Sequence, residues 1–377
     1  MLSFWEQNSF LHYDYVVIGA GLTGLNTACA LKEKNPKASV LVLDKGILPT
    51  GASTKNAGFA CIGSYSEKWA DYQRLGENEF LHLIEQRWLG LYLLRKRLGD
   101  DNMDYLNFGG FELLLNQEAH FEDQMHMLNR MLYGIFRKQV FYNVPQFIQQ
   151  FGFNAEMIST MLFNPFEGQI DSGKTIQTLL NYAGILQIRI LSGVDVQHIE
   201  ANTNGVDIHC KNTQQSVTFK AQQVAICTNA FTKQFLPEEE IIPGRGQVLC
   251  TSPIDDLKFK GIFHFDEGYY YFRNFGNRII FGGGRNLDFE GETTTEFGLT
   301  DRIQKQLLFF LDEMIIPGTA YQVENQWSGI MAFNEQKTPL VKRVNDRVVV
   351  GARLNGMGVA LSAKIAEELS LLLLGKK

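Results

Sequence analysis

The chain has little of what marks several protein classes. Its 377 residues include only five cysteines, which are scattered without a C-x-x-C pair. This usage predicts reduced thiols and a cytoplasmic location. The apolar run Leu371 to Leu374 is too short to span a membrane, so no transmembrane segment is expected. The amino-terminal residues show no basic segment followed by an apolar stretch, so no secretory signal is predicted.

Basic charge is also scarce. The chain has 35 Lys and Arg against 41 Asp and Glu, a net charge of −6 and a pI near 5.7, and no basic stripe stands out. Nucleic acid is therefore not an expected partner. The seven histidines lack H-E-x-x-H spacing, so no metal site is predicted. No G-x-S-x-G segment is present, so hydrolase chemistry has no support.

What the chain does have is a complete dinucleotide-binding pattern near its start. Asp14 to Ile18 is a short apolar strand, and the turn Gly19-Ala20-Gly21-Leu22-Thr23-Gly24 follows at once. A helix is expected from Leu25 to about Lys34, then a buried strand from Ser39 to Leu43 that ends on Asp44. A G-x-G-x-x-G turn between a strand and a helix, with an acid about twenty residues later, is typical of dinucleotide binding.

Each residue of this pattern has a physical role. Gly19 permits the tight turn, and Gly21 lets the backbone approach a pyrophosphate at the amino terminus of the helix. Gly24 lets the helix pack closely on the strand. The Asp44 carboxylate can accept hydrogen bonds from ribose hydroxyls and would repel a 2′-phosphate, which disfavours NADP. The alternative is a glycine-rich turn that binds nothing.

The rest of the chain predicts two interleaved domains. Helices are expected over residues 66–98, 117–137, 174–183, 300–311 and 360–374. Strands are expected near residues 108–115, 188–190, 194–199, 206–210, 216–219, 224–228 and 347–351, with a hairpin of Tyr269–Arg273 and Arg278–Phe281. Strands of the dinucleotide domain thus occur at the beginning, middle and end. The predicted fold is mixed α/β, a Rossmann-like domain with an interleaved domain on an antiparallel or mixed sheet.

Five blocks of sequence together resemble the FAD-dependent D-amino-acid oxidase superfamily, which includes glycine, sarcosine and γ-glutamylputrescine oxidases. They are Gly19–Gly24 with Asp44, Gly51–Phe59, Cys227–Phe231, Pro243–Gln247 and Gly351–Val359, in family order over nearly the whole chain. The closest likeness is to the γ-glutamylputrescine-oxidase-like and glycine-oxidase-like branch. That branch favours Arg-Asn-small-Gly where this chain has Lys55-Asn56-Ala57-Gly58.

The resemblance implies FAD as the cofactor. It places the FAD-binding domain in residues 1–65, 145–240 and 322–377, and the substrate domain in residues 66–144 and 241–321. The turn Gly356-Met357-Gly358-Val359 opens a helix whose free N–H groups would stabilise charge on the reduced flavin. The implied FAD contacts are Gly19, Gly21, Leu22, Thr23, Gly24, Asp44, Lys45, Ser53, Thr54, Asn56, Ala57, Val196, Thr228, Asn229, Gly351, Gly356, Met357, Gly358 and Val359.

The chain departs from the family at two positions. Family members that oxidise amino acids supply an arginine to the substrate carboxylate from a G-[LIV]-R-P segment, where this chain has Gly329-Ile330-Met331-Ala332. A thioether cannot clamp a carboxylate, so Met331 favours an amine over a simple α-amino acid. Members with covalent flavin use a His in the second block or a late Cys. Here Asn56 takes the first place and no Cys follows Cys250, so non-covalent FAD is predicted.

Three further residues are candidates for the substrate side. Arg273 ends an aromatic strand that the resemblance places over the flavin, where it could bind an anionic group or serve as a structural charge. Tyr269 and Tyr271 share one face of that strand and could wall the substrate or fill core. With Met331, these residues form the predicted catalytic set. Arg245 and Lys55 could approach the flavin, although structural roles suit both better.

The predicted function is oxidation of a C–N bond. The resemblance implies that an amine or amino acid passes hydride to flavin N5 and that the imine then hydrolyses. Electrons would leave to O₂ or to an electron carrier. Two alternatives stay open: a 2-hydroxy-acid or polyol dehydrogenase of the same superfamily, which needs a base that no motif block supplies, and an FAD-binding module or pseudoenzyme that serves a partner protein.

Overall fold

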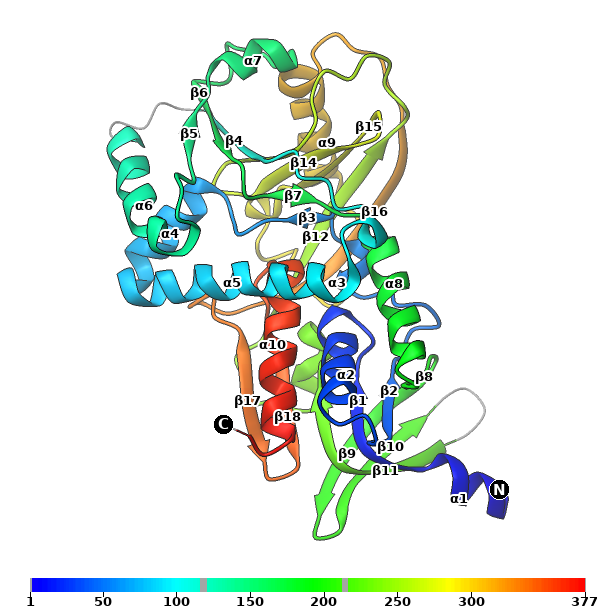
Figure 1. The fold of residues 1–377 in the computed structure, drawn as a ribbon. Helices are drawn as coiled ribbons and strands as arrows, with labels where there is room; N and C mark the ends of the chain where they lie inside the picture. The colour runs from blue at the N-terminus through cyan, green and yellow to red at the C-terminus, as the bar shows by residue number, and fades with distance from the viewer. Residues whose placement is uncertain (1, 116–120, 212–215, 377) are drawn as a thin grey trace.

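The computed structural model describes residues 2–115, 121–211 and 216–376. In this part of the chain two eight-stranded sheets dominate, one in the lower half of Figure 1 and one in the upper half. β3 (Phe59–Ala60) and β7 (Gly168–Gln169) form a separate two-stranded ribbon. The mixed α/β fold predicted from the sequence is confirmed.

The first sheet is built on the dinucleotide-binding pattern. Its ordered strands are β17 (Leu340–Asn345), β18 (Val348–Ala352), β11 (Ser216–Ile226), β1 (His12–Ile18), β2 (Val40–Leu43) and β8 (Arg189–Leu191), with β9 (Asp195–Asn202) and β10 (Gly205–Lys211) added at β11. The strands from β18 to β8 run parallel, and β17 is antiparallel. Because β2, β18 and the second half of β1 (Val16–Ile18) are apolar and buried, they suit a sheet that is covered on both faces.

Helices α2 (Leu22–Lys34) and α10 (Gly358–Leu373) lie side by side beside this sheet, and α5 (Glu77–Leu98) crosses the molecule between the two sheets (Figure 1). Their contact needs small residues. A Cβ on Gly90 of α5 would lie 1.9 Å from the carbonyl oxygen of Ala360 in α10. Gly90 therefore lets the two helix backbones touch. The remaining helices in chain order are α1 (Phe4–Phe10), α3 (Ala52–Lys55), α4 (Tyr65–Leu75), α6 (Phe121–Phe136), α7 (Gln146–Phe151), α8 (Ser172–Ile185) and α9 (Asp301–Phe310).

The second sheet is mostly antiparallel. Its ordered strands are β16 (Val323–Phe333), β12 (Ile242–Thr251), β15 (Arg278–Gly283), β14 (Tyr270–Phe275), β13 (Ile262–Phe265), β4 (Gly110–Leu114), β6 (Thr160–Asn164) and β5 (Tyr142–Asn143). One face carries stacked rings such as Phe263 and Phe272, whose centroids are 4.7 Å apart, and packs against α9 and the π-helix η4 (Leu311–Ile315) that follows it. The other face, which we call the inner face, carries Arg273, Tyr271 and His264.

The described elements differ from the predicted ones in several places. The helix expected over residues 66–98 is two helices, α4 and α5, which meet at Gly76 with a φ of +76°, and strands β6, β16 and β17 were not predicted. The segments 216–219 and 224–228, expected as two strands, form the single strand β11, whose first half pairs with β10 and whose second half pairs with β1 and β18. The helix expected from residue 117 is described only from Phe121, so its first residues lie outside the described part.

Two strands of the predicted FAD-binding domain lie in the second sheet. Strands β6 and β16 fall in ranges that were assigned to the FAD-binding domain, yet they pair in the second sheet. The long strand β16 continues through a short connection into β17 of the first sheet, so the two sheets share one stretch of chain. Sheet membership thus shifts these two strands to the other layer, and the domain boundaries remain a prediction.

Candidate functional site

The glycine turn after β1 is as tight as the pattern requires. Gly19 has a φ of +104°, and a Cβ there would lie 2.6 Å from the carbonyl oxygen of Cys227. A Cβ on Gly24 would lie 1.8 Å from the carbonyl oxygen of Gly19. Neither position can carry a side chain without moving backbone. Gly19 and Gly24 therefore fix how β1, β11 and α2 meet, and this leaves the amino terminus of α2 open.

Asp44 lies at the end of β2, where the pattern predicts the ribose-binding acid. Its Oδ2 accepts from the N–H of Ala20 at 2.7 Å, and its Oδ1 accepts from the N–H of Gly46 at 2.9 Å. Burial raises the pKa of this carboxyl, and the two backbone N–H groups oppose the rise. Each oxygen keeps a further lone pair for a hydroxyl. The neighbouring Lys45 points away, with its side chain 76% exposed and paired with Asp195 at 3.1 Å.

Ser53, in the short helix α3, faces the start of α2. The N–H of Leu22 donates to Ser53 Oγ at 2.9 Å, and a Cβ on Gly21 would lie 2.9 Å from the same oxygen. A hydroxyl therefore stands beside the free N–H groups of a helix start, where phosphate oxygens bind well. Thr23 is buried in the first turn of α2. The Thr54 hydroxyl is used locally, since it donates to the carbonyl oxygen of Pro49.

Asn56 holds the segment after α3 in place. Its Nδ2 donates to the carbonyl oxygen of Ser53 at 2.7 Å. Its Oδ1 accepts from the N–H of Gly58 at 2.8 Å and from Ser172 Oγ at 2.7 Å. Three bonds of one amide thus fix the loop that contains the buried Ala57. These contacts give Asn56 a positioning role, and direct contact with a flavin remains a prediction.

The carboxyl-terminal block forms a tight turn between β18 and α10. Gly356 has a φ of +80°, and Met357 is the residue before the first turn of α10. Asn229, at φ +45°, accepts from the N–H of Arg353 at 3.1 Å and so ties this turn to the end of β11. The first N–H groups of a helix, here Gly358 and Val359, have no partner within the helix.

Three other predicted cofactor contacts show more structural roles. A Cβ on Gly351 would lie 2.5 Å from Leu369, so this glycine lets α10 pack on β18. The carbonyl oxygen of Val196 accepts from Gln234 Nε2 at 2.9 Å. The Thr228 hydroxyl lies 3.0 Å from that of Thr232. Their contacts with FAD stay predictions.

Part of the inner face of the second sheet, near the turn at Gly356, is made of Gly244 and Gly246 of β12 and Gly329 of β16, and we call it the glycine floor. Gly244 and Gly246 of β12 pair with Met331 and Gly329 of β16. A Cβ on Gly246 would lie 2.8 Å from Met331 Cε and 3.6 Å from the Tyr271 hydroxyl, and one on Gly356 would lie 3.8 Å from Met331 Sδ. Met331 therefore stands between the sheet floor and the turn that opens α10. The structure brings Met331, Tyr271 and Gly356 together.

Arg273 is placed deeper than an open substrate contact. Its side chain is 3% exposed, and its Nη1 donates to the carbonyl oxygens of Ile170 at 2.9 Å and Gly58 at 3.2 Å. Burial lowers its pKa to about 10. The guanidinium thus ties the loop after Asn56 to β14. Its predicted role toward substrate stays a prediction, and its visible role is positioning.

The two tyrosines differ from each other. Burial raises the pKa of Tyr271 to about 12, and its ring meets that of Phe59 edge to face at 5.7 Å. Tyr269 lies just before β14 and packs edge to face on Phe289 at 5.8 Å. Tyr271 therefore belongs to the wall beside Met331, whereas Tyr269 belongs to the rim near Arg285.

Sequence reasoning missed His264, which pairs with Tyr271 across the inner face. Its ring lies 5.0 Å from that of Phe59, and its Nε2 is buried without a hydrogen-bond partner among the described residues. Burial lowers its pKa to about 4, so the imidazole is neutral at pH 7. A lone histidine between aromatic residues gave no sequence signal, because its surroundings come from strands and loops far apart in the chain.

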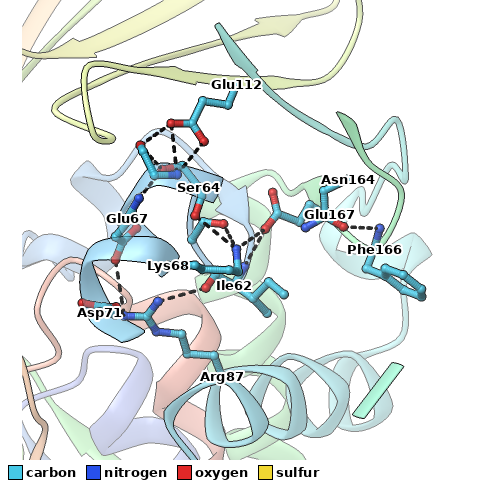
Figure 2. A network of polar contacts seen from close by, with 12 residues as sticks. Ile62, Ser64, Glu67, Lys68, Asp71, Arg87, Glu112, Asn164, Phe166 and Glu167 are labelled. Carbon is cyan, nitrogen blue, oxygen red and sulfur yellow. Dashed lines mark hydrogen bonds and ion pairs between the residues drawn. The ribbon is translucent and has the colours of Figure 1, made fainter. Parts of the chain in front are cut away.

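A buried network of charges supports the segment that follows Phe59 (Figure 2). Lys68 Nζ lies 3.7 Å from Glu167 Oε1, and Arg87 Nη2 lies 3.3 Å from Glu67 and 3.4 Å from Asp71. The N–H of Ile62 donates to Glu167 at 3.0 Å, and Arg87 Nη1 donates to the carbonyl oxygen of Ile62 at 2.9 Å. Lys68 also donates to the carbonyl oxygen of Gly63. These bonds hold residues 62–68 behind Phe59.

Three acids of this region, Asp71, Glu112 and Glu167, have pKa values that burial raises. Burial raises the pKa of Glu112, which accepts from the N–H of Ser66 at 3.1 Å, to about 7. Burial also raises the pKa of Glu167, and Lys68 opposes the rise. Among residues 2–115, 121–211 and 216–376 no group of three or more His, Cys, Asp or Glu could hold a metal ion. No helix in the same part of the chain is long and apolar enough to cross a membrane.

The chain is similar in sequence and in fold to several known proteins. Probable oxidoreductase OrdL from Haemophilus influenzae is 22% identical and covers 93% of this chain and 80% of its own length. The crystal structure of L-proline dehydrogenase from P. horikoshii has a TM-score of 0.77 at 16% identity, over 97% of this chain and 95% of that one. Glycine oxidase from Geobacillus kaustophilus has a TM-score of 0.77 at 17% identity, over 97% of this chain and 96% of that one.

Residues 14–372, nearly the whole chain, match the family described as FAD dependent oxidoreductase. The glycine turn, the paired oxygens of Asp44 and the turn before α10 fit a dinucleotide that carries a flavin. The chain therefore belongs to the FAD-dependent oxidoreductase (DAO) family, and its cofactor is FAD.

Proposed function

We propose that this protein oxidises a C–N bond of an amine or amino acid. The observation that carries the proposal is the glycine floor of β12 and β16, which lies beside Met331 and the turn at Gly356. A substrate that lies on this floor would have its reacting carbon next to the cofactor. FAD supplies the acceptor for the hydride.

The residues around this floor would orient the substrate and exclude water. Met331 and Phe59 offer apolar surface to the substrate, and Tyr271 is protonated at neutral pH because burial raises its pKa to about 12. None of these three side chains is a base at pH 7, which suits an amine that binds neutral and loses a hydride without deprotonation. The names of the similar solved proteins, a glycine oxidase and a proline dehydrogenase, support C–N chemistry.

The FAD contacts proposed from the sequence fall into two groups. Gly19, Gly21, Ser53 and Asp44 would hold the adenosine and pyrophosphate, and the turn from Gly356 to Val359 would face the flavin. We propose that FAD is bound non-covalently, because Asn56 fills the place of an attachment histidine and its amide already makes local bonds. The substrate is a small molecule, and the electron acceptor is O₂ or a carrier.

A second candidate, oxidation of an alcohol such as a 2-hydroxy acid, rests on His264. Taking hydride from an alcohol requires a base for the hydroxyl proton. His264 is neutral at pH 7, and its Nε2 has no hydrogen-bond partner among the described residues. The Phe59 ring packs on both the imidazole and the ring of Tyr271, so an alcohol would have to reach the imidazole past aromatic side chains.

The experiment is anaerobic reduction of the bound flavin, which is measured as the loss of the flavin absorbance. The panel is glycine and sarcosine, an alkylamine and a polyamine, and lactate as the hydroxy acid. The proposal expects bleaching by at least one nitrogen compound and none by lactate. Bleaching by lactate alone, abolished in His264→Asn, would replace the proposal with the second candidate. Release of a ketone or aldehyde together with ammonia or an amine, after the flavin is bleached, confirms cleavage of the C–N bond.

The electron acceptor is tested separately. Enzyme reduced by the best substrate is mixed with air-saturated buffer or with a quinone, and the return of flavin absorbance is timed. Fast return with O₂ and formation of peroxide identify an oxidase. Return with quinone alone identifies a dehydrogenase.

A further inference from the structure

Arg285 lies on the inner side of the second sheet, directly after β15, and no sequence motif pointed to it. It follows two glycines of positive φ, Gly283 and Gly284, which turn the chain back over the sheet. Its guanidinium carbon is 4.4 Å from the ring centroid of Phe333 and 5.4 Å from that of Phe289. Stacking on two rings is a common setting for an arginine that binds an anion in a partly dry site.

The Arg285 guanidinium has no hydrogen bond or ion pair among the described residues, and its Nε is buried without a partner. Its neighbours show how unusual this is. Arg245 is held by the buried carboxylate of Glu292 through two bonds of 2.8 Å, and Arg273 donates to two carbonyl oxygens. Burial lowers the pKa of Arg285, and Tyr269 and Glu292 oppose the shift. A half-buried guanidinium that makes no hydrogen bond or ion pair among the described residues can bind an anion from outside the chain.

Arg285 and Met331 lie on the same part of the inner face. A Cβ on Gly244 would lie 2.8 Å from the guanidinium carbon of Arg285. Gly244 pairs directly with Met331, and Met331 reaches to Gly356 and Gly246. The guanidinium therefore projects over the same glycine floor as Met331, from the opposite side of β12. An arginine at Met331 would point into the space that Arg285 enters from the neighbouring strand.

We propose that Arg285 binds the carboxylate of the substrate and so takes the place of the arginine that Met331 lacks. The inference rests on the proposed function and narrows it from amines in general to amines that carry a carboxylate. Two parallel N–H groups of the guanidinium would meet the two carboxylate oxygens, while Phe333 and Phe289 fix its plane. The absent side chain of Gly244 leaves the room that this contact needs.

The test uses the holoenzyme and ligands that cannot be oxidised. Benzoate and acetate carry the carboxylate, and benzamide and acetamide are their neutral matches. Binding is followed by the change in the absorbance of oxidised flavin on titration. The wild type is expected to bind at least one carboxylate and to bind its amide more weakly. Arg285→Met should weaken carboxylate binding by roughly ten- to a hundredfold, the usual size of a charge-assisted hydrogen bond, with amide binding unchanged.

Two further variants separate the contact from folding. Gly244→Ala keeps the charge but places a methyl group against the guanidinium, and it should weaken carboxylate binding in the same direction. Arg302→Met removes an exposed arginine of α9 and is expected to change nothing. Flavin content and melting temperature are measured for each variant. If Arg285→Met yields no flavoprotein, Gly244→Ala and Arg285→Lys carry the test, since a lysine keeps the charge but not the paired geometry.

The results distinguish this inference from the proposed function. Carboxylate binding that is unchanged in both Arg285→Met and Gly244→Ala overturns the inference, as does a wild type that binds neither carboxylate. Bleaching of the flavin by amines would in either case leave the proposed function standing. Loss of carboxylate binding in a protein that no amine or amino acid reduces would instead keep the anion site and remove the proposed function.

Discussion

Removing the Lys68 charge should destabilise the protein in a pH-dependent way. Lys68 and Glu167 are 0% and 2% exposed, and 3.7 Å separates their charged atoms. Breaking a buried pair by deleting one partner costs about 3–5 kcal/mol, because the other charge stays buried and unpaired. Lys68→Met also leaves the carbonyl oxygen of Gly63 without its donor. We expect a loss at the upper part of that range at about pH 8.

Protonation of Glu167 limits the loss. Burial already raises the pKa of Glu167 in the folded protein, and removal of Lys68 raises it further. The folded variant then binds a proton that the unfolded chain releases, so its stability rises as the pH falls toward the unfolded pKa of about 4.3. The difference between Lys68→Met and the wild type should therefore shrink between about pH 8 and about pH 5. Adding Glu167→Gln should remove most of this pH dependence.

The assay is urea unfolding of the FAD-bound protein followed by tryptophan fluorescence. Trp69 and Trp88 adjoin Lys68 and Arg87 in sequence, and Trp88 packs on Phe136 with ring centroids 5.0 Å apart. Arg302→Met serves as the matched control for a lost surface charge. The reasoning fails if Lys68→Met is equally destabilised at both pH values, or if the double variant is no more stable than Lys68→Met at pH 8.

Three other predictions follow from the site. Gly24→Ala should yield no folded protein, because its Cβ would meet backbone, whereas Gly21→Val should fold poorly and lose the yellow colour; normal flavin content in Gly21→Val refutes the pyrophosphate assignment. Acid precipitation should release FAD into the supernatant, and colour kept in the washed pellet contradicts non-covalent binding. The pKa of Glu112 is raised to about 7, so its contribution to stability is present at low pH and is lost as the pH rises through 7. The stability of Glu112→Gln relative to the wild type should therefore increase between about pH 5 and about pH 8. If the melting temperatures of the two proteins change in parallel with pH, Glu112 does not titrate in this range.

The sequence was most informative where contacts are local. The strand, turn and helix around Gly19 and Gly24 are close in the chain, and their pattern predicted the first layer of the fold. The strand β11 was divided because Lys220, Gln222 and Gln223 interrupt its apolar run, although each half simply pairs with a different neighbour. Strand periodicity indicates which residues alternate but not which strands meet.

The substrate side depends on such distant meetings. Met331 reaches Gly356 only because β16 pairs with β12, and Arg285 reaches Gly244 only because two glycines turn the chain after β15. Lys68 and Glu167 are about a hundred residues apart in the chain and belong to none of the motifs found in the sequence. Their burial is a property of the assembled layers. No local pattern could have predicted it, and the same is true of the neutral His264.

The Glu292 carboxylate has a consequence for engineering this protein. It is fully buried and accepts hydrogen bonds from Arg245, Gln247 and Thr300, so one acid fixes the loop to β12 at Glu292 and at Thr300. Residues 293–299 between these anchors include the exposed Phe297, whose ring lies 5.0 Å from Lys55 Nζ. We call residues 293–299 the rim; they can be varied while Glu292 and Thr300 hold the two ends of this stretch. Libraries that vary this rim and leave Glu292 intact should alter which molecules enter without unsettling the sheet beneath.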